Sequence, residues 1–362
     1  MCIRDRYHIA IALPLLFFVT GVFYRKLTNI LVFFTILTIG TIVSFRDISV
    51  DRDSIVYFTV FNDLSNINSL YELWIFSLSY GQEIGFILLM KLFHLFGASY
   101  YVFRGCFEFL TLFFIWSFIK KTCDDLFYLI AFFLYISMFL YFRDFTQIRF
   151  SFSCVMALNS IYYRLKNNNS RSIAYFMAGL LVHNSILIIA PILLLIKFKF
   201  IYTAKFYFSS IVVALLLFKI NIFGVLINTG YLPHQITRYI NQDEMMGNTF
   251  GFTAIITIVV SFLMCLRFRE YYGIDYKLLY LNMLFSSITA LVFMNIPIMM
   301  RMQLLCLTAI IILPNVIYTY WIRKDSANRL LLKIFFVSVC IIYYYSVLST
   351  GIVSGYKTFF SI

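Results

Sequence analysis

Charged side chains are scarce in this chain. Only 12% of its 362 residues are Asp, Glu, Lys or Arg, whereas 62% are hydrophobic. Soluble domains carry roughly 25% charged residues, so this composition excludes a soluble enzyme or binding domain. Apolar stretches of about 20 residues, long enough to cross a bilayer, recur from end to end with little between them. The composition therefore predicts an all-α polytopic membrane protein with no separate soluble catalytic domain.

Motifs of several other protein classes are missing. The seven cysteines are scattered without a C-x-x-C pair, which favours small packing residues over a metal or disulfide site. The four histidines show no metal-ligand spacing, and there is no glycine-rich loop for a nucleotide phosphate. We therefore expect no metal and no cofactor. The net charge of +13 does not indicate a nucleic-acid partner, because Lys and Arg lie in short loops between apolar spans.

The hydrophobic pattern predicts ten full crossings in a single integral membrane domain, residues 1–362. The predicted crossings are 8–24, 29–45, 100–119, 126–142, 145–163, 203–226, 251–267, 278–294, 302–321 and 331–350. Two further segments are short or broken. Segment 84–97 is shorter than the ~17 residues that a crossing helix needs, and His183-Asn184-Ser185 interrupts segment 172–196. Broken membrane helices are tolerated mainly where they line a water-filled or protein-filled site.

The distribution of Lys and Arg orients the chain. If both irregular segments return to the side from which they came, the basic loops all fall on one side, which is the cytoplasm. The extracytoplasmic side then receives the loops 46–83 and 227–250. The first loop carries two arginines against six acidic residues, a net charge of −4. An acidic loop suits the exterior.

Residues that could act in catalysis or substrate binding lie at the extracytoplasmic end in this topology. They are the acids Asp51, Asp53 and Glu83, the histidine His183, and the arginines Arg46, Arg143, Arg149 and Arg301. Several planar guanidinium groups can together hold a pyrophosphate. Arg149 and Arg301 each stand at or inside a helix end, which favours a substrate role. Arg143 beside Asp144 also fits an interfacial ion pair, and Arg46 also fits a helix-end anchor.

Short motifs follow one another in order along nearly the whole chain. They are Phe45-Arg46-Asp47, Asp51-Arg52-Asp53 with Tyr57, Glu83-Ile84-Gly85-Phe86, Gln147-Ile148-Arg149, His183-Asn184-Ser185, and Arg301 with Pro314. This ordered set resembles the EpsG-like branch of Wzy-type polysaccharide polymerases. The family often has an Arg-Gln pair and a Gly near these positions. Here Phe150 follows Arg149, and Val50 precedes Asp51.

The resemblance implies a GT-C-like membrane glycosyltransferase of the bacterial inner membrane. Its donor and acceptor would both be glycans carried on polyprenyl pyrophosphate, and its product an O-antigen, capsule or exopolysaccharide. A hydroxyl of one unit attacks the anomeric carbon of the other chain, and the lipid pyrophosphate leaves. The expected partners are these lipid-linked glycans and membrane lipids, with a flippase and a chain-length regulator.

Such a reaction needs charge stabilisation on the leaving group and a base near the attacking hydroxyl. The four arginines fit the first need, and the three acids and His183 fit the second. We favour Asp51 or Asp53 as the base, because an exterior carboxylate reaches a sugar hydroxyl without entering the hydrocarbon. His183 also fits a hydrogen-bonded core residue beside a helix break.

Other functions stay open. An O-antigen ligase uses the same donor and differs only in its acceptor. A flippase for lipid-linked oligosaccharides, or another transporter, would more often show an internal duplication, which this sequence does not show. A membrane O-acyltransferase also uses a histidine in an apolar stretch, but the exterior arginines fit a pyrophosphate better than a thioester.

Overall fold

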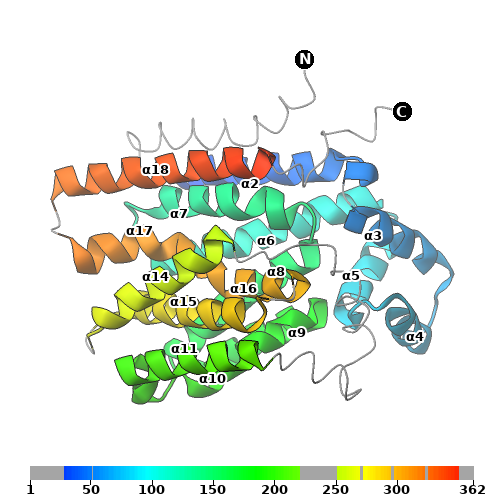
Figure 1. Ribbon diagram of the computed structural model, residues 1–362. Helices are drawn as coiled ribbons and strands as arrows, with labels where there is room; N and C mark the ends of the chain where they lie inside the picture. Colours follow the sequence, from blue (N-terminus) through cyan, green and yellow to red (C-terminus); the bar gives the residue numbers. More distant parts are fainter. Residues whose placement is uncertain are drawn as a thin grey trace. The chain divides into compact units, whose positions relative to one another are not determined.

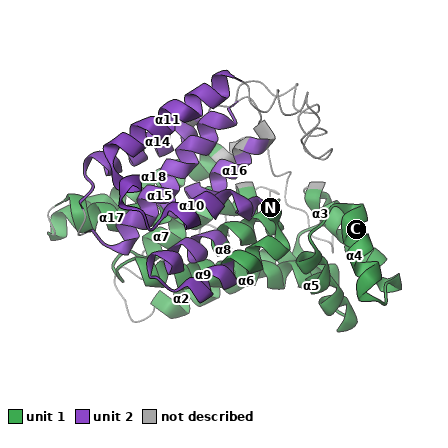
Figure 2. Cartoon of the chain, turned by 90° about the horizontal axis from the view of Figure 1, so that it is seen from below, with its two compact units in different colours: residues 1–156, 176–184, 311–362 green, residues 157–175, 185–310 purple. Residues whose placement is uncertain are grey.

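The computed structural model describes residues 28–50, 52–220, 251–269, 272–294, 297–322 and 325–349 (Figure 1). The regular elements in these ranges are helices, as the composition predicts. The chain divides into two compact units (Figure 2). Unit 1 comprises residues 1–156, 176–184 and 311–362, and unit 2 comprises residues 157–175 and 185–310.

Several helices are long and apolar enough to cross a membrane, so the chain has the character of a multi-pass membrane protein. Among the described residues these are α2 (Thr28–Phe45), α6 (Tyr100–Thr122), the stretch Arg301–Trp321, and Ser326–Ser346 within α18 (Ser326–Ser349). A fifth span arises if α4 (Leu70–Tyr80) and α5 (Ile84–Leu95), bent by 120°, form one broken crossing.

The predicted count of ten full crossings goes beyond what these helices support. The remaining predicted crossings correspond to shorter, interrupted or more polar helices: α7 (Tyr128–Tyr135) with the π-helical η4 (Ile136–Asp144), α8 (Ile148–Leu165), α11 (Ala204–Lys219), α14 (Phe252–Leu266) and α15 (Ile274–Val292). The predicted crossing 8–24 and the predicted loop 227–250 lie outside the described residues.

Unit 1 is organised around α6. Helix α2 packs along α6, and small residues allow the two backbones to approach each other. A Cβ added to Gly105 would lie 2.7 Å from the Cβ of Ser44, whereas one added to Gly40 would be 3.5 Å from the nearest atom. Figure 1 shows α18 alongside α7, in agreement with its packing against α7 and η4.

The predicted loop 46–83 is largely helical, with α3 (Arg52–Asp63) and α4 in it. Helix α4 begins with a capping box, in which the Ser69 hydroxyl accepts from the Glu72 N–H at 3.1 Å. It ends at Gly81, whose φ of 61° is left-handed and suits glycine. Two residues, Gln82 and Glu83, then lead into α5. The side of the membrane on which this region lies stays a prediction.

The predicted interruption at His183-Asn184-Ser185 is confirmed. Helix α9 (Asn169–Val182) ends just before His183, and the 3-10 turn η5 (Asn184–Ile189) leads into α10 (Ala190–Leu195). The Ser153 hydroxyl of α8 donates to the carbonyl of Gly179 at 2.8 Å and to that of His183 at 3.3 Å. These bonds satisfy carbonyl groups at the helix end, where the helical ladder stops.

Unit 2 is organised around α15, which packs against α11, α14 and α16 (Pro297–Leu307). Polar side chains join these helices inside the apolar core. The Tyr276 hydroxyl donates to the carbonyl of Met264 at 2.6 Å, and the Ser286 hydroxyl donates to that of Gln303 at 3.2 Å. Such bonds between neighbouring helices replace the water that a bilayer does not supply.

Candidate functional site

A polar cluster in unit 1 joins three chain segments that are far apart in the sequence. Glu83 precedes α5, Arg149 is the second residue of α8, and Tyr57 lies in α3. Arg149 Nη1 forms an ion pair with Glu83 Oε2, and Arg149 Nε donates to the Tyr57 hydroxyl at 3.2 Å. The charged side chains are 12% and 13% exposed, which places them at the edge of the packed interior. We call Tyr57, Glu83, Phe86, Arg149 and Asn184 the Arg149 cluster.

Glu83 has both carboxylate oxygens occupied. Oε2 faces Arg149, and Oε1 accepts a hydrogen bond from the backbone N–H of Asn184 at 2.9 Å. That N–H lies at the start of η5, where a helical turn has no acceptor of its own. Glu83 thus connects the start of α8 to the helix break at His183.

Two aromatic rings fix the plane of the Arg149 guanidinium. Its Cζ lies 5.3 Å from the ring centroid of Tyr57 and 5.4 Å from that of Phe86, within the range of cation–π attraction. The two rings meet edge to face, with centroids 5.4 Å apart. No described residue accepts a hydrogen bond from Arg149 Nη2, so this donor is available to a ligand.

Burial raises the pKa of Tyr57 to about 12. Its hydroxyl therefore keeps its proton at neutral pH. Because the oxygen accepts from Arg149 Nε, the hydroxyl hydrogen can be donated to an anion. Asp53, half-buried in the first turn of α3, is near enough for its charge to act on both Tyr57 and Arg149. A proton donor, a cation and a carboxylate therefore lie within electrostatic reach of one another.

Because Gly85 is a glycine and has no side chain, α5 can approach α9 closely at this position. A Cβ at this position would lie 2.6 Å from the carbonyl oxygen and the Cβ of Leu181. This close contact brings Glu83, two residues earlier, within reach of the Asn184 N–H. The His183 ring packs against that of Phe150, with centroids 5.6 Å apart. His183 therefore lies beside the Arg149 cluster, next in sequence to Asn184.

Arg46 and Arg143, which the sequence predicts as pyrophosphate ligands, are fully buried. Arg46 Nη2 donates to the carbonyl of Phe145 at 2.5 Å and to the Ser54 hydroxyl at 3.3 Å. Arg143 forms an ion pair with Asp144, Nε to Oδ1 3.0 Å, in which both side chains are 0% exposed. Their guanidinium groups are thus engaged by protein groups.

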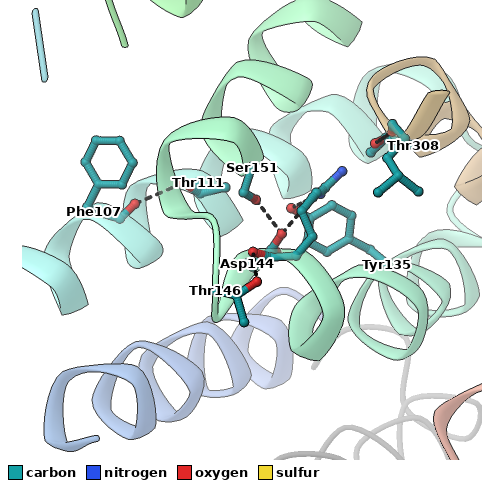
Figure 3. A network of polar contacts seen from close by, with 9 residues as sticks. Phe107, Thr111, Tyr135, Asp144, Thr146, Ser151 and Thr308 are labelled. Carbon is teal, nitrogen blue, oxygen red and sulfur yellow. Dashed lines mark hydrogen bonds and ion pairs between the residues drawn. The ribbon is translucent and has the colours of Figure 1, made fainter. Parts of the chain in front are cut away.

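Asp144 lies in a network of polar contacts (Figure 3). The Ser151 hydroxyl donates to Asp144 Oδ1, and Arg143 Nη2 donates to the Tyr135 hydroxyl at 2.9 Å. The ion pair between Arg143 and Asp144, which the sequence allowed as an alternative, is present and lies buried inside the protein. A role for Arg143 or Arg46 in binding pyrophosphate stays a prediction.

Comparison with known families decides the identity of the chain. The model of the EpsG family matches residues 29–360. The chain belongs to the EpsG family. This match confirms the predicted resemblance, and it implies a role in exopolysaccharide biosynthesis. No curated protein and no solved structure matches the chain.

Two further predicted site residues of this EpsG-family chain are Asp51 and Arg301. Asp51 lies outside the described residues. Arg301 lies in α16 of unit 2, and its side chain is exposed. The roles predicted for Asp51 and Arg301 stay predictions.

Two buried charged residues of this EpsG-family chain escaped the sequence analysis. Arg104 donates to the Ser54 hydroxyl at 3.3 Å and to the carbonyls of Ser44, at 3.3 Å, and Arg46. Glu108, one turn further along α6, has no hydrogen-bond partner for either carboxylate oxygen among the described residues. Two opposite charges four residues apart within a long apolar run could have predicted these two buried residues from the sequence.

Proposed function

We propose that this EpsG-family protein is a polysaccharide polymerase. It joins polyprenyl-pyrophosphate-linked repeat units by glycosyl transfer on the extracytoplasmic face of a bacterial inner membrane. The observation that carries the proposal is the Arg149 cluster. Its partly exposed guanidinium is held in a fixed plane, and its Nη2 donor has no acceptor among the described residues. A guanidinium presented in this way suits the oxygens of a pyrophosphate.

The reaction forms one bond and breaks another at the same carbon. A hydroxyl oxygen of the acceptor glycan attacks the anomeric carbon of the donor. The bond from that carbon to the pyrophosphate oxygen breaks, and the leaving group takes the electron pair. Arg149 Nη2 and the Tyr57 hydroxyl donate to the pyrophosphate oxygen as its charge grows, which is where preorganised donors contribute most.

The proton of the attacking hydroxyl needs an acceptor, and we assign this role to Asp53. Its carboxylate is half-buried one helical turn before Tyr57, and it can take the proton as the new bond forms. Asp51, two residues earlier, is the alternative base in the same acidic segment. His183, packed on Phe150, is the next candidate.

Glu83 is a positioning residue in this proposal. Its two oxygens already accept from Arg149 and from the Asn184 N–H, so neither is directed at a sugar hydroxyl. By pairing with Nη1, the carboxylate leaves Nη2 directed elsewhere. Glu83 thus acts through Arg149 and the helix break.

The test is conversion of a purified lipid-linked repeat unit into a polymer ladder by the purified full-length protein. We expect ladders from the wild type and a loss of roughly 100-fold or more in rate for Asp53→Asn, as for removal of a general base. Asp63→Asn is the matched control, because Asp63 ends the same helix, is exposed, and accepts a hydrogen bond from the Tyr80 hydroxyl. His183→Gln is expected to retain most of the activity.

Three results would change the proposal. Transfer of a single glycan to a lipid acceptor without ladders would indicate a ligase. Movement of the lipid-linked unit across vesicles without any glycosidic bond would indicate a flippase. Wild-type rates for Asp53→Asn, with a strong defect in Asp51→Asn or His183→Gln, would move the base to that residue.

Gly85→Ala is expected to lower polymerisation strongly. The new methyl group would collide with the backbone of Leu181, and the overpacking should cost about 1–3 kcal/mol. Relief of the collision would pull Glu83 away from Asn184 and Arg149. Gly40→Ala is the control, because its methyl group would find ordinary contact distances of 3.5 and 3.7 Å. Equal ladder formation by the two variants would show that the α5–α9 approach does not set the site.

A further inference from the structure

A second surface, in unit 2, combines exposed cations with exposed aromatic rings. We call it the basic-aromatic surface, and its residues are Lys197, Phe198, Lys199, Phe200, Arg267 and Arg269. Lysines and phenylalanines alternate from 197 to 200, at the entry to the turn η6 (Lys199–Tyr202). Phe198 is 54% and Phe200 49% exposed, and the four cations are exposed as well.

Aromatic stacking brings the two parts of this surface together. The ring of Tyr202, at the end of η6, stacks on that of Phe268, with centroids 5.0 Å apart and planes 12° apart. The Tyr280 hydroxyl of α15 donates to the carbonyl of Ile201 at 3.1 Å. Because Phe268 stands between Arg267 and Arg269, these contacts hold the arginines near the lysine-bearing segment.

The charge of the surface is strongly positive. Residues 197–205 contain three lysines and no acid, a charge of +3, and residues 267–277 contain three basic and two acidic residues, a charge of +1. Together the two segments carry +4. This charge favours an anionic partner, and the exposed aromatic rings favour a partner that also has an apolar part.

The rings of Phe198 and Phe200 lie side by side, with centroids 5.7 Å apart, and they form an apolar tip among cations. In water such a tip is unfavourable, whereas at a bilayer surface it can enter the boundary between head groups and acyl chains. The lysines and arginines around it then meet lipid phosphates. An amphiphile with an anionic head and an apolar tail matches both halves of this surface.

We propose that the basic-aromatic surface is a binding site for an anionic glycerophospholipid of the surrounding leaflet. The phosphate is held by the lysines and arginines, and the acyl chains lie against Phe198 and Phe200. The site is independent of the Arg149 cluster and of the polymerase proposal, because no residue is shared. It serves to anchor unit 2 at the membrane surface.

The test uses purified full-length protein in neutral detergent with phosphatidylglycerol or phosphatidylcholine as probe, and native mass spectrometry counts the retained lipid. We expect the wild type to retain phosphatidylglycerol in preference. The variant with Lys197, Lys199, Arg267 and Arg269 all changed to Gln should lose about tenfold or more in affinity for it. The matched control changes Lys120, Lys121, Lys166 and Arg171 to Gln, which removes the same charge elsewhere, and it should bind like the wild type.

Two milder double variants test whether loss of lipid comes from misfolding of the four-Gln variant. Lys197→Arg with Lys199→Arg keeps the charge and should retain the lipid. Phe198→Ser with Phe200→Ser also keeps the charge but removes the aromatic rings, and it should retain less lipid. Equal retention of both lipids by the wild type, or unchanged retention by the four-Gln variant, would overturn the proposal. Displacement by excess soluble glycerol phosphate would assign the site to a free phosphate, and loss of a co-purifying acidic protein with unchanged lipid would assign it to a protein partner.

Discussion

Arg149→Lys is expected to reduce polymer formation by about 100-fold or more, although the positive charge is kept. A lysine ammonium cannot pair with Glu83, donate to Tyr57 and still present a further donor in a fixed plane, as the guanidinium does. Loss of one preorganised donor to a developing oxyanion typically costs that much in rate. The measurement is the initial rate of ladder formation from a purified lipid-linked repeat unit.

Cells carrying Arg149→Lys should accumulate single repeat units while the abundance of the protein in the membrane stays normal. Arg171→Lys is a suitable control, because Arg171 is exposed and lies over the Tyr163 ring in unit 2. Full-length polymer made by Arg149→Lys at the wild-type rate would remove Arg149 from the leaving-group site. The sequence predicts impairment for Arg301→Lys as well, and the same assay decides that case.

Arg143→Met should strongly destabilise the protein, by about 3–5 kcal/mol, as expected when one partner of a buried ion pair is removed. Asp144 would lose its only cationic hydrogen-bond donor among the described residues while it stays fully buried. Glu108 would lose its electrostatic interaction with the positive charge of Arg143. Unfolding of the purified protein in mixed micelles, followed by circular dichroism, measures this effect.

The double variant Arg143→Met with Asp144→Leu separates charge from packing. Removal of both charges should recover much of the stability, because an uncompensated buried charge is worse than a neutral pair of similar size. Arg143→Lys should be intermediate, since it restores charge without the bonds to both Asp144 and Tyr135. Equal loss in the single and double variants would mean that packing, and not the ion pair, sets the stability of this network.

Long apolar elements could be predicted from the sequence. Helices α2 and α6 lie within one to three residues of their predicted bounds, because a run of some 20 apolar residues has few alternatives in a bilayer. The break at His183 was equally readable, since three polar residues in the middle of an apolar segment favour local side-chain bonding over the helical ladder.

Shorter and irregular elements escaped prediction for physical reasons. Helix α4 is too short to cross a membrane by itself, and hydropathy alone treats its region as a loop, although Ser69 and Glu72 form a capping box that the sequence displays. The π-helical geometry of η4 depends on tertiary packing and has no local signature. The average hydropathy of residues 100–119 is that of an apolar segment, and an average does not reveal Arg104 and Glu108 within it.

The site was predicted as a set of residues and not as an arrangement. The distribution of Lys and Arg predicted Glu83, Arg149 and His183 on one side of the membrane, but nothing local pairs Glu83 with Arg149, which is 66 residues away. The contact requires α5 to meet α9 at Gly85. Nor does spacing distinguish Arg149, which keeps a donor for a ligand, from Arg143, which pairs with its own neighbour.

In the π-helical segment η4, residues Ile136–Asp144, the number of residues matters as much as which residues they are. In a π-helical stretch each backbone hydrogen bond spans one residue more than in an α-helix. Deletion of one residue there would let the chain rewind as an α-helix and would rotate everything beyond it by about 100°. Arg143 and Asp144 would swing out of their network, and Arg149, which follows after one short turn, would be misdirected. In related chains, insertions and deletions should therefore accumulate between helices and be absent from this segment, even where its individual side chains vary.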